Sequence, residues 1–219
     1  MMSPTNRHWL DAFIPHDRGR EISMMMRQAN NALACFSGKA SAPDARIRLK
    51  VVVVGELGCG KSSLTQQKLM SAPTIGLELS VKMVEAPDGT PIKCQIWDCS
   101  GKMMSGIQPN YLANACAVVL CYDISSLSSF TALKDWLSFA RRSCNADRKR
   151  EGRSITFALV GTKADVRGEP AVTGAEHDAF AAAHGIRISC RTSATAEEAQ
   201  TVWSRVALAH VASGGRMLQ

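Results

Sequence analysis

The segment that most constrains this chain is a glycine-rich loop, Gly55–Ser62, which directly follows four consecutive valines. It has the pattern G-x-x-x-x-G-K-[ST], in which glycines let the backbone wrap around phosphate oxygens and direct N–H groups at them. The valine run predicts a strand buried on both faces, and residues 62–70 predict a helix, so the loop has the strand–loop–helix setting that the motif requires. The loop therefore predicts phosphate binding in an α/β fold.

Two side chains of this loop have expected roles with a bound nucleotide. Lys61 is expected to neutralise charge on the β- and γ-phosphates, and the Ser62 hydroxyl is expected to ligate Mg²⁺. The residues of this segment that we expect to contact nucleotide are Gly55, Gly58, Cys59, Gly60, Lys61, Ser62 and Ser63.

Strand and helix patterns alternate from Ile47 onward. We expect strands at 48–54, 77–85, 92–98, 115–122, 155–161 and 187–190, and helices at 62–70, 126–142, 173–184 and 196–212. The turn signal Pro87–Thr90 makes a hairpin of the strands on either side of it. This alternation predicts a three-layer, doubly wound α/β fold whose mainly parallel sheet carries one antiparallel edge strand.

Composition and charge bound the remaining choices. We expect a flexible N-terminal extension over residues 1–46, one domain over 47–212 and a short tail over 213–219. The net charge is +7, and the densest basic group comprises Arg141, Arg142, Arg148, Lys149, Arg150 and Arg153. We interpret that group as a solvated loop rather than a nucleic-acid or lipid patch, so no nucleic-acid partner is expected.

The cysteines and the chain ends bear on the cellular compartment. The eight cysteines include no C-x-x-C pair, which indicates reduced, mostly buried thiols of a cytosolic protein. No apolar run has the roughly 20 residues of a membrane span, and no signal peptide is recognisable. The last cysteine is Cys190, so no prenyl membrane anchor is expected.

A second polar element, Asp98–Gly101, follows the hairpin strand. Asp98 ends that strand, where it can hold Mg²⁺ through a water. Gly101 has no side chain and can bring its N–H close to a γ-phosphate. The pattern Asp-x-x-Gly is weak alone and gains weight from its position downstream of the phosphate loop.

Two further strand ends carry residues suited to recognising guanine. The Asp165 carboxylate can accept both N1–H and N2–H₂ of guanine, and adenine lacks that donor pair. The Lys163 stem can lie over the base and brace the phosphate loop, and Thr162 precedes it. At the other strand end, a backbone N–H near Ser193 and Ala194 can bond guanine O6.

These four elements, in this order and spacing, resemble the small GTPases of the Ras superfamily, over about residues 47–212. The resemblance implies a P-loop GTPase fold with a six-stranded sheet and about five helices. It implies GTP/GDP and Mg²⁺ as cofactors and two switch segments that read the nucleotide state. It also implies that Thr74 ligates Mg²⁺ in the GTP state and that Gly101 bonds the γ-phosphate.

Finer details resemble the Rab branch. They are Pro73-Thr74-Ile75-Gly76, Gln95-Ile96-Trp97-Asp98 and Tyr122-Asp123-Ile124-Ser125 leading to Ser129-Phe130. A narrower resemblance is to the Rab-like GTPase subunit of the intraflagellar transport B complex, which also has Lys after Ala-Gly or Ser-Gly and lacks a prenylated tail. The implied partners are protein effectors or transport-complex subunits. The implied location is cytoplasmic, either in a cilium or flagellum or peripheral to endomembranes.

Two residues depart from the family pattern near the γ-phosphate. Lys102 replaces the Gln that orients the attacking water, and a lysine can donate to that water but cannot accept from it. Leu57 is bulky where an inserted arginine would need space. Both changes predict hydrolysis at or below the ~10⁻⁴ s⁻¹ of unaided small GTPases.

The first switch is short, with 74 − 61 = 13 residues from Lys61 to Thr74. A helix that reaches Met70 is about 13 Å long, and the residues after it span only about that distance when extended. Either this helix ends near Gln67, or Thr74 does not reach Mg²⁺.

Three functions remain open from the residues. The chain is a regulatory GTP-binding protein with slow hydrolysis, in intraflagellar or endomembrane transport, or it is a scaffold subunit in which nucleotide is structural or absent. The third function, an ATP-using P-loop kinase, is disfavoured by Asp165 and by Ser193-Ala194.

Overall fold

The computed structural model describes residues 47–66, 77–99, 109–148, 155–193 and 195–214. The chain divides into two units, Met1–Ala40 and Ser41–Gln219, and every described residue belongs to the second unit. The predicted extension over 1–46, most of the predicted tail and the site residues Thr74, Gly101, Lys102 and Ala194 lie outside the described residues.

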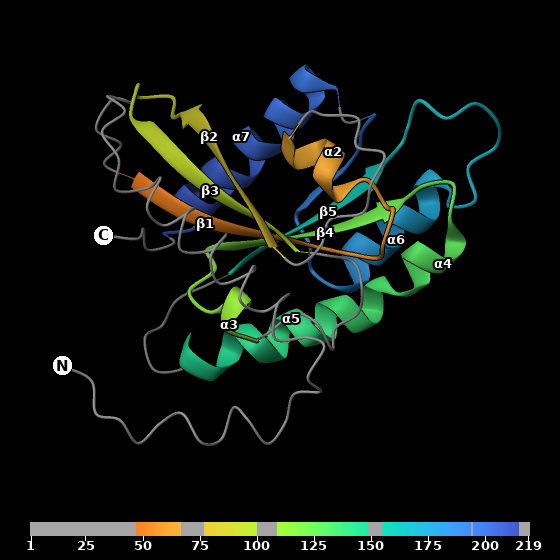
Figure 1. Cartoon of the computed structure of the whole chain (residues 1–219), viewed down its shortest axis with the longest axis horizontal. Helices are drawn as coiled ribbons and strands as arrows, with labels where there is room; N and C mark the ends of the chain where they lie inside the picture. The colour runs from red at the N-terminus through yellow and green to blue at the C-terminus, as the bar shows by residue number, and fades with distance from the viewer. Residues whose placement is uncertain (1–46, 67–76, 100–108, 149–154, 194, 215–219) are drawn as a thin grey trace, which may run out of the picture. The chain divides into compact units, whose positions relative to one another are not determined.

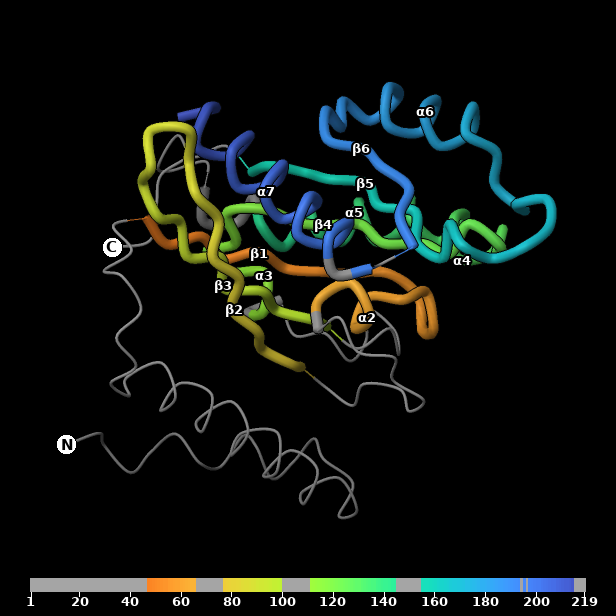
Figure 2. The backbone as a smooth tube through the Cα atoms, turned by 90° about the horizontal axis from the view of Figure 1, so that it is seen from above, coloured from red at the N-terminus to blue at the C-terminus, as the bar shows by residue number. Residues whose placement is uncertain are grey.

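A six-stranded sheet forms the centre of the described domain (Figure 1). Its strands are β1 (Ile47–Val54), β2 (Leu77–Glu85), β3 (Pro91–Cys99), β4 (Ala117–Asp123), β5 (Thr156–Thr162) and β6 (Ile188–Arg191). The order across the sheet is β2-β3-β1-β4-β5-β6, and only the β2–β3 pair is antiparallel. Figure 2 shows the β2–β3 hairpin at one side of the domain and β6 with α6 at the other. The predicted fold class is confirmed.

Helices cover both faces of the sheet. They are α2 (Lys61–Gln66), α3 (Pro109–Leu112), α4 (Leu127–Thr131), α5 (Leu133–Arg148), α6 (Gly174–Ala183) and α7 (Ala196–Ala212). Buried side chains of α2 and α7 pack on one face, and those of α3, α5 and α6 pack on the other. None of the helices in the described segments is long and apolar enough to cross a membrane.

The valine run of β1 is apolar throughout because both faces of that strand are covered. Val51 and Val53 belong to the core beneath α7, whereas Val52 and Val54 belong to the core beneath α5. Alternate side chains of a strand point to opposite faces, so a central strand of a three-layer domain needs apolar residues at every position. The glycine-rich loop thus begins at a rigid, fully buried strand end.

The helix predicted over 126–142 differs from the observed one. It is divided at Ala132 into α4 and α5, and α5 continues to Arg148. The continuation has a packing reason, because Trp136, Ala140 and Cys144 are buried at four-residue spacing and lie on one helix face. Arg141, Arg142 and Arg148 therefore lie on a helix and not in the loop that their charge suggested, while the other basic residues of that group lie outside the described residues.

The cysteines agree with the predicted reduced state. The seven cysteines in the described segments are free thiols, and six of them are buried. Burial raises the pKa of the Cys94 and Cys99 thiols to about 12, so both stay protonated near neutral pH.

Candidate nucleotide-binding site

The predicted site residues lie at one edge of the sheet, because parallel strands end at the same edge. Lys61 begins α2, after the loop that follows β1, and Asp98 is the next-to-last residue of β3. Lys163 directly follows the end of β5, and Ser193 lies just after the end of β6. The register aligns these ends, since Val53 pairs with Asp98 and Gly161 pairs with Arg191. Ligand sites of open α/β sheets lie at this edge, outside the carboxyl ends of the strands.

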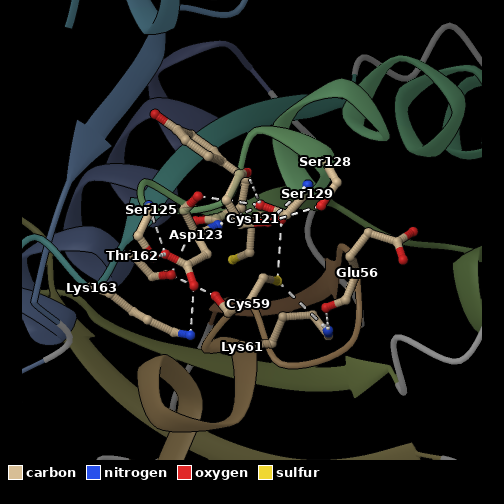
Figure 3. Close-up of polar contacts among 12 residues, drawn as sticks. Glu56, Cys59, Lys61, Cys121, Asp123, Ser125, Ser128, Ser129, Thr162 and Lys163 are labelled. Carbon is tan, nitrogen blue, oxygen red and sulfur yellow. Dashed lines mark hydrogen bonds and ion pairs between the residues drawn. The ribbon is translucent and has the colours of Figure 1, made fainter. Parts of the chain in front are cut away.

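Lys61 lies in the centre of the phosphate loop. Its Nζ donates to the carbonyl oxygens of Gly55, at 2.9 Å, and Glu56, at 2.7 Å, and the residue is only 5% exposed. Figure 3 shows the Lys61 ammonium beneath the loop formed by these residues. The lysine thus ties the two ends of the loop together and presents a fixed positive charge to anything that the loop encloses.

Steric and backbone constraints explain why three positions of the loop are glycine. A Cβ on Gly55 would lie 2.1 Å from the carbonyl oxygen of Cys121 in β4, which no side chain permits. Gly58 and Gly60 have φ values of 76° and 83°, a left-handed conformation that favours glycine. Cys59, between them, is buried, and its Sγ donates to the same Cys121 oxygen at 3.4 Å.

Asp98 and Ser62 form the region in which a divalent cation fits. Ser62 lies beside Ser63 in the first turn of α2, and its hydroxyl donates to the Asp98 carboxylate. Thr65 Oγ1 also donates to this carboxylate, at 3.4 Å. The second oxygen, Asp98 Oδ1, is buried and has no hydrogen-bond partner within the described residues. Burial raises the pKa of this carboxyl. A buried carboxylate oxygen without a donor next to a hydroxyl is a donor set that suits Mg²⁺, which prefers hard oxygen ligands.

Thr162 braces the phosphate loop from β5. Its Oγ1 lies 2.5 Å from the carbonyl oxygen of Cys59 and 3.0 Å from that of Tyr122, so one hydroxyl links β5, β4 and the loop. A Cβ on Gly60 would approach the same hydroxyl to 3.0 Å, so loop and threonine are closely packed. The hydroxyl thus takes the bracing role that the sequence assigned in part to Lys163.

Lys163 has a different partner from the predicted one. Its Nζ pairs with Asp123 Oδ2 at 2.6 Å, and among the described residues no bond from Nζ to the phosphate loop is present. Burial would raise the pKa of Asp123, but hydrogen bonds from Lys163 and Ser125 outweigh it and lower the pKa. Lys163 has a φ of 60°, which is rare for a residue with a side chain and typical of functional loops.

The two base-recognition loops lie next to each other. Ala164 N donates to Thr192 O at 3.1 Å, and Thr192 N donates to Gly161 O at 2.7 Å. Asp165 is solvent-exposed at the tip of the first loop. This arrangement leaves the Asp165 carboxylate accessible to a base held between the loops.

The sequence did not predict three side chains that shape this edge. Asp123, at the end of β4, holds Lys163, and Glu56 Oε1 accepts from Trp136 Nε1 of α5 at 3.0 Å. Glu198 of α7 accepts from Ser193 N, at 2.7 Å, and Ser193 Oγ, at 2.5 Å. Asp123 had a usable signal, since it is polar at the end of a buried strand. Glu198 lies three residues after Thr195, a spacing that predicts a helix cap, so the sequence gives no sign that its carboxylate accepts from Ser193.

The comparison with known families agrees with this geometry. The family model of the Ras family matches residues 50–209, which span the phosphate loop, the sheet and most of α7. The chain therefore belongs to the Ras family, whose members are small GTP-binding proteins with GTPase activity that use GTP or GDP together with Mg²⁺.

Proposed function

We propose that this protein is a Rab-like small GTP-binding protein that hydrolyses GTP slowly and acts in intracellular or intraflagellar transport by recruiting protein partners. The observation that carries the nucleotide part is that Lys61 at the start of α2, Asp98 at the end of β3 and Asp165 on the loop after β5 all lie at the carboxyl ends of the sheet strands. A buried ammonium, a buried carboxylate and an exposed carboxylate at that edge match the phosphates, the metal and the base of one nucleotide.

Each part of the ligand has its residues on this chain. The loop N–H groups and Lys61 hold the phosphates, Ser62 and Asp98 hold Mg²⁺, and Asp165 accepts from guanine N1–H and N2–H₂. Bound Mg²⁺ neutralises charge on the β- and γ-phosphates. We assign Thr74 and Gly101 to Mg²⁺ and the γ-phosphate by their resemblance to the family pattern, and Ser193 and Ala194 to guanine O6.

Slow hydrolysis follows from two residues at the γ-phosphate end. Lys102, in place of glutamine, cannot accept a hydrogen bond from the attacking water. Leu57 is 45% exposed, so its side chain projects from the phosphate loop where an arginine of an activating protein would enter. We expect a single-turnover rate at or below ~10⁻⁴ s⁻¹.

Partner recruitment has support on the edge strand β2. Val81 and Met83 are exposed large apolar side chains on this strand and lie at alternate positions, so they face the same side of the sheet. Exposed apolar groups at a sheet edge mark surfaces for protein contact. We place the protein in the cytoplasm, in a cilium or flagellum or peripheral to endomembranes.

The test measures nucleotide selectivity first. Purified full-length chain at millimolar Mg²⁺ is titrated with fluorescent mant-GDP and mant-ADP, and Asp165→Ala is the variant. We expect tight mant-GDP binding, binding of mant-ADP weaker by roughly 10⁴, and loss of this preference in the variant. A chain that binds neither nucleotide would instead be a scaffold that uses the fold for its surface.

The pathway is tested separately, by recovering partners from cells. Wild-type chain is compared with a Val81→Asp/Met83→Asp double variant. Recovery of intraflagellar transport subunits by the wild type alone supports the intraflagellar branch, whereas recovery of endosomal tethers supports the endomembrane branch. Equal recovery by both chains would exclude β2 as the recruiting surface.

A further inference from the structure

We propose that Trp136 of helix α5 is a positioning residue for the phosphate loop, which it holds through the carboxylate of Glu56 so that bound nucleotide is released slowly. This inference rests on the proposed nucleotide binding and assigns a role to a residue outside the motif. The contact is a hydrogen bond from Trp136 Nε1 to Glu56 Oε1, 3.0 Å long.

Trp136 is a rigid anchor. It is 1% exposed, lies near the start of α5, and packs edge-on against Phe139 with ring centroids 6.5 Å apart. Its helix packs against the core formed by β4 and β5. A buried indole on such a helix has one orientation, so its N–H is a fixed donor and not an adaptable one.

Among the described residues, the outer part of the phosphate loop, residues 56–58, is held by a small number of contacts. Glu56 is held at both ends, since its carbonyl oxygen accepts from Lys61 and its carboxylate accepts from Trp136. In Figure 3 the Glu56 carboxylate points away from the Lys61 ammonium. Leu57 is 45% exposed, and a Cβ placed on Gly58 would meet no described atom within 4 Å apart from those of its chain neighbours. Within the described residues, the indole bond therefore ties this part of the loop to helix α5.

Glu56 can act on nucleotide release in two ways: its bond to Trp136 can position the loop, and its negative charge can repel the phosphates. A carboxylate in a phosphate loop repels the nucleotide phosphates, so for charge alone its removal should strengthen binding. A glutamine has the same length and keeps an oxygen that accepts from Trp136, but it carries no charge. If the bond positions the loop, glutamine preserves slow release and alanine does not.

The chain offers a matched control for the tryptophan. Trp203 of α7 is also 1% exposed, and its Nε1 has no acceptor in the part of the chain that the structure describes. Trp203→Phe and Trp136→Phe remove the same atoms from equally buried sites, but only the second change breaks a bond to the phosphate loop.

The experiment measures release of mant-GDP from the full chain at millimolar Mg²⁺, after addition of excess GDP. We expect Trp136→Phe and Glu56→Ala to accelerate release roughly tenfold, the effect of losing one hydrogen bond to a charged group. Glu56→Gln and Trp203→Phe should release no faster than wild type. In ¹⁵N-labelled protein, the Trp136 indole N–H resonance should move toward that of an unbonded indole in Glu56→Ala and should move much less in Glu56→Gln, which keeps a neutral acceptor.

The outcomes separate this inference from the proposed function. Wild-type rates in both Trp136→Phe and Glu56→Ala, with binding intact, would overturn the positioning role alone. Equal acceleration in Trp203→Phe would also overturn it, because the effect would then be general loosening. If Trp136→Phe does not fold, Glu56→Ala at the half-buried partner decides. A wild-type chain that binds no mant-GDP would sink the proposed function, and this inference with it.

Discussion

At the scale of the residue, the hydroxyl of Thr162 connects three parts of the chain. It lies within hydrogen-bond distance of the Cys59 carbonyl in the phosphate loop and of the Tyr122 carbonyl in β4. The residue is 1% exposed, so no solvent replaces a lost bond. A small polar side chain therefore controls how the phosphate loop lies on the sheet.

Replacing Thr162 tests this connection. Thr162→Val keeps the shape and removes the single O–H donor that the Cys59 and Tyr122 carbonyl oxygens share, so we expect a loss of about 1–3 kcal/mol in the free energy of unfolding. Urea denaturation of the nucleotide-free chain measures it. Thr162→Ser keeps the hydroxyl and should lose clearly less. Equal losses in both variants would assign the effect to packing.

A second residue, Lys50 of β1, is charged inside the core. Its Nζ donates to Ala113 O at 2.8 Å and lies 3.7 Å from the centroid of the Trp97 ring. Burial lowers the pKa of Lys50 from 10.5 to about 8. The carbonyl and the indole face are polar enough to hold the ammonium but do not replace its water fully.

This shift predicts a pH dependence. Between pH 8 and 10.5 the unfolded chain keeps the Lys50 proton and the folded chain releases it, so the free energy of unfolding rises with pH in that window. The full shift corresponds to about 3 kcal/mol. Urea denaturation of wild type and Lys50→Met across this window measures it. The rise should appear in the difference between the two chains, which cancels thiol titrations common to both, and a flat difference would contradict it.

At the scale of the element, helix α7 positions a loop of the candidate site. Glu198 in its first turn accepts from Ser193 N, Ser193 Oγ and Thr192 Oγ1. The Ser193 hydroxyl leads the contacts that lower the pKa of Glu198, so the carboxylate stays charged near neutral pH. The first turn of α7 thereby holds Thr192 and Ser193, which follow the end of β6 and begin the second base-recognition loop.

We expect Glu198→Ala to weaken mant-GDP binding about tenfold, because the 192–193 loop loses its acceptor and must be ordered by the ligand. Equilibrium titration at fixed Mg²⁺ measures this. Glu197→Ala is the matched control. Glu197 is also exposed and lies in the same first turn of α7, so its replacement removes the same negative charge from the helix start. Equal weakening in both variants would indicate a helix-dipole effect instead.

At the scale of the whole molecule, ligand binding and stability are linked through the sheet edge. The expected nucleotide contacts come from loops after β1, β3, β5 and β6, which are far apart in sequence. A ligand that bridges these loops binds the folded chain and not the unfolded one. Its binding free energy therefore adds to the stability of the entire domain.

Thermal unfolding should report this linkage. With GDP and Mg²⁺ at 100 times the dissociation constant, we expect about 2.7 kcal/mol of added stability, or a melting temperature higher by about 5–10 °C. Excess EDTA should remove much of the increase by removing Mg²⁺. Differential scanning calorimetry checks both steps, with ADP as the control ligand. A melting temperature that GDP leaves unchanged would contradict the prediction.

The sequence by itself determined the order of elements and the class of site. Local signals carry that information, since four valines predict a doubly buried strand and glycines at set spacing predict a phosphate loop. The predicted strand 77–85 and the predicted helix 196–212 have the same bounds as β2 and α7, because local sequence patterns determine them as well. The predicted C-terminal end of helix α5, at residue 142, was wrong. The buried Cys144 packs on the core and extends α5 past its polar residues to Arg148.

Only the tertiary structure decided which side chains meet at the sheet edge. The Glu56–Trp136 bond joins residues 80 positions apart, and Lys163 pairs with Asp123 instead of the phosphate loop. Such partners depend on the alignment of strand ends and on side-chain reach, and neither leaves a periodic pattern in the sequence. The glycine-rich loop that the sequence identified is thus held by residues that become its neighbours only when the sheet forms.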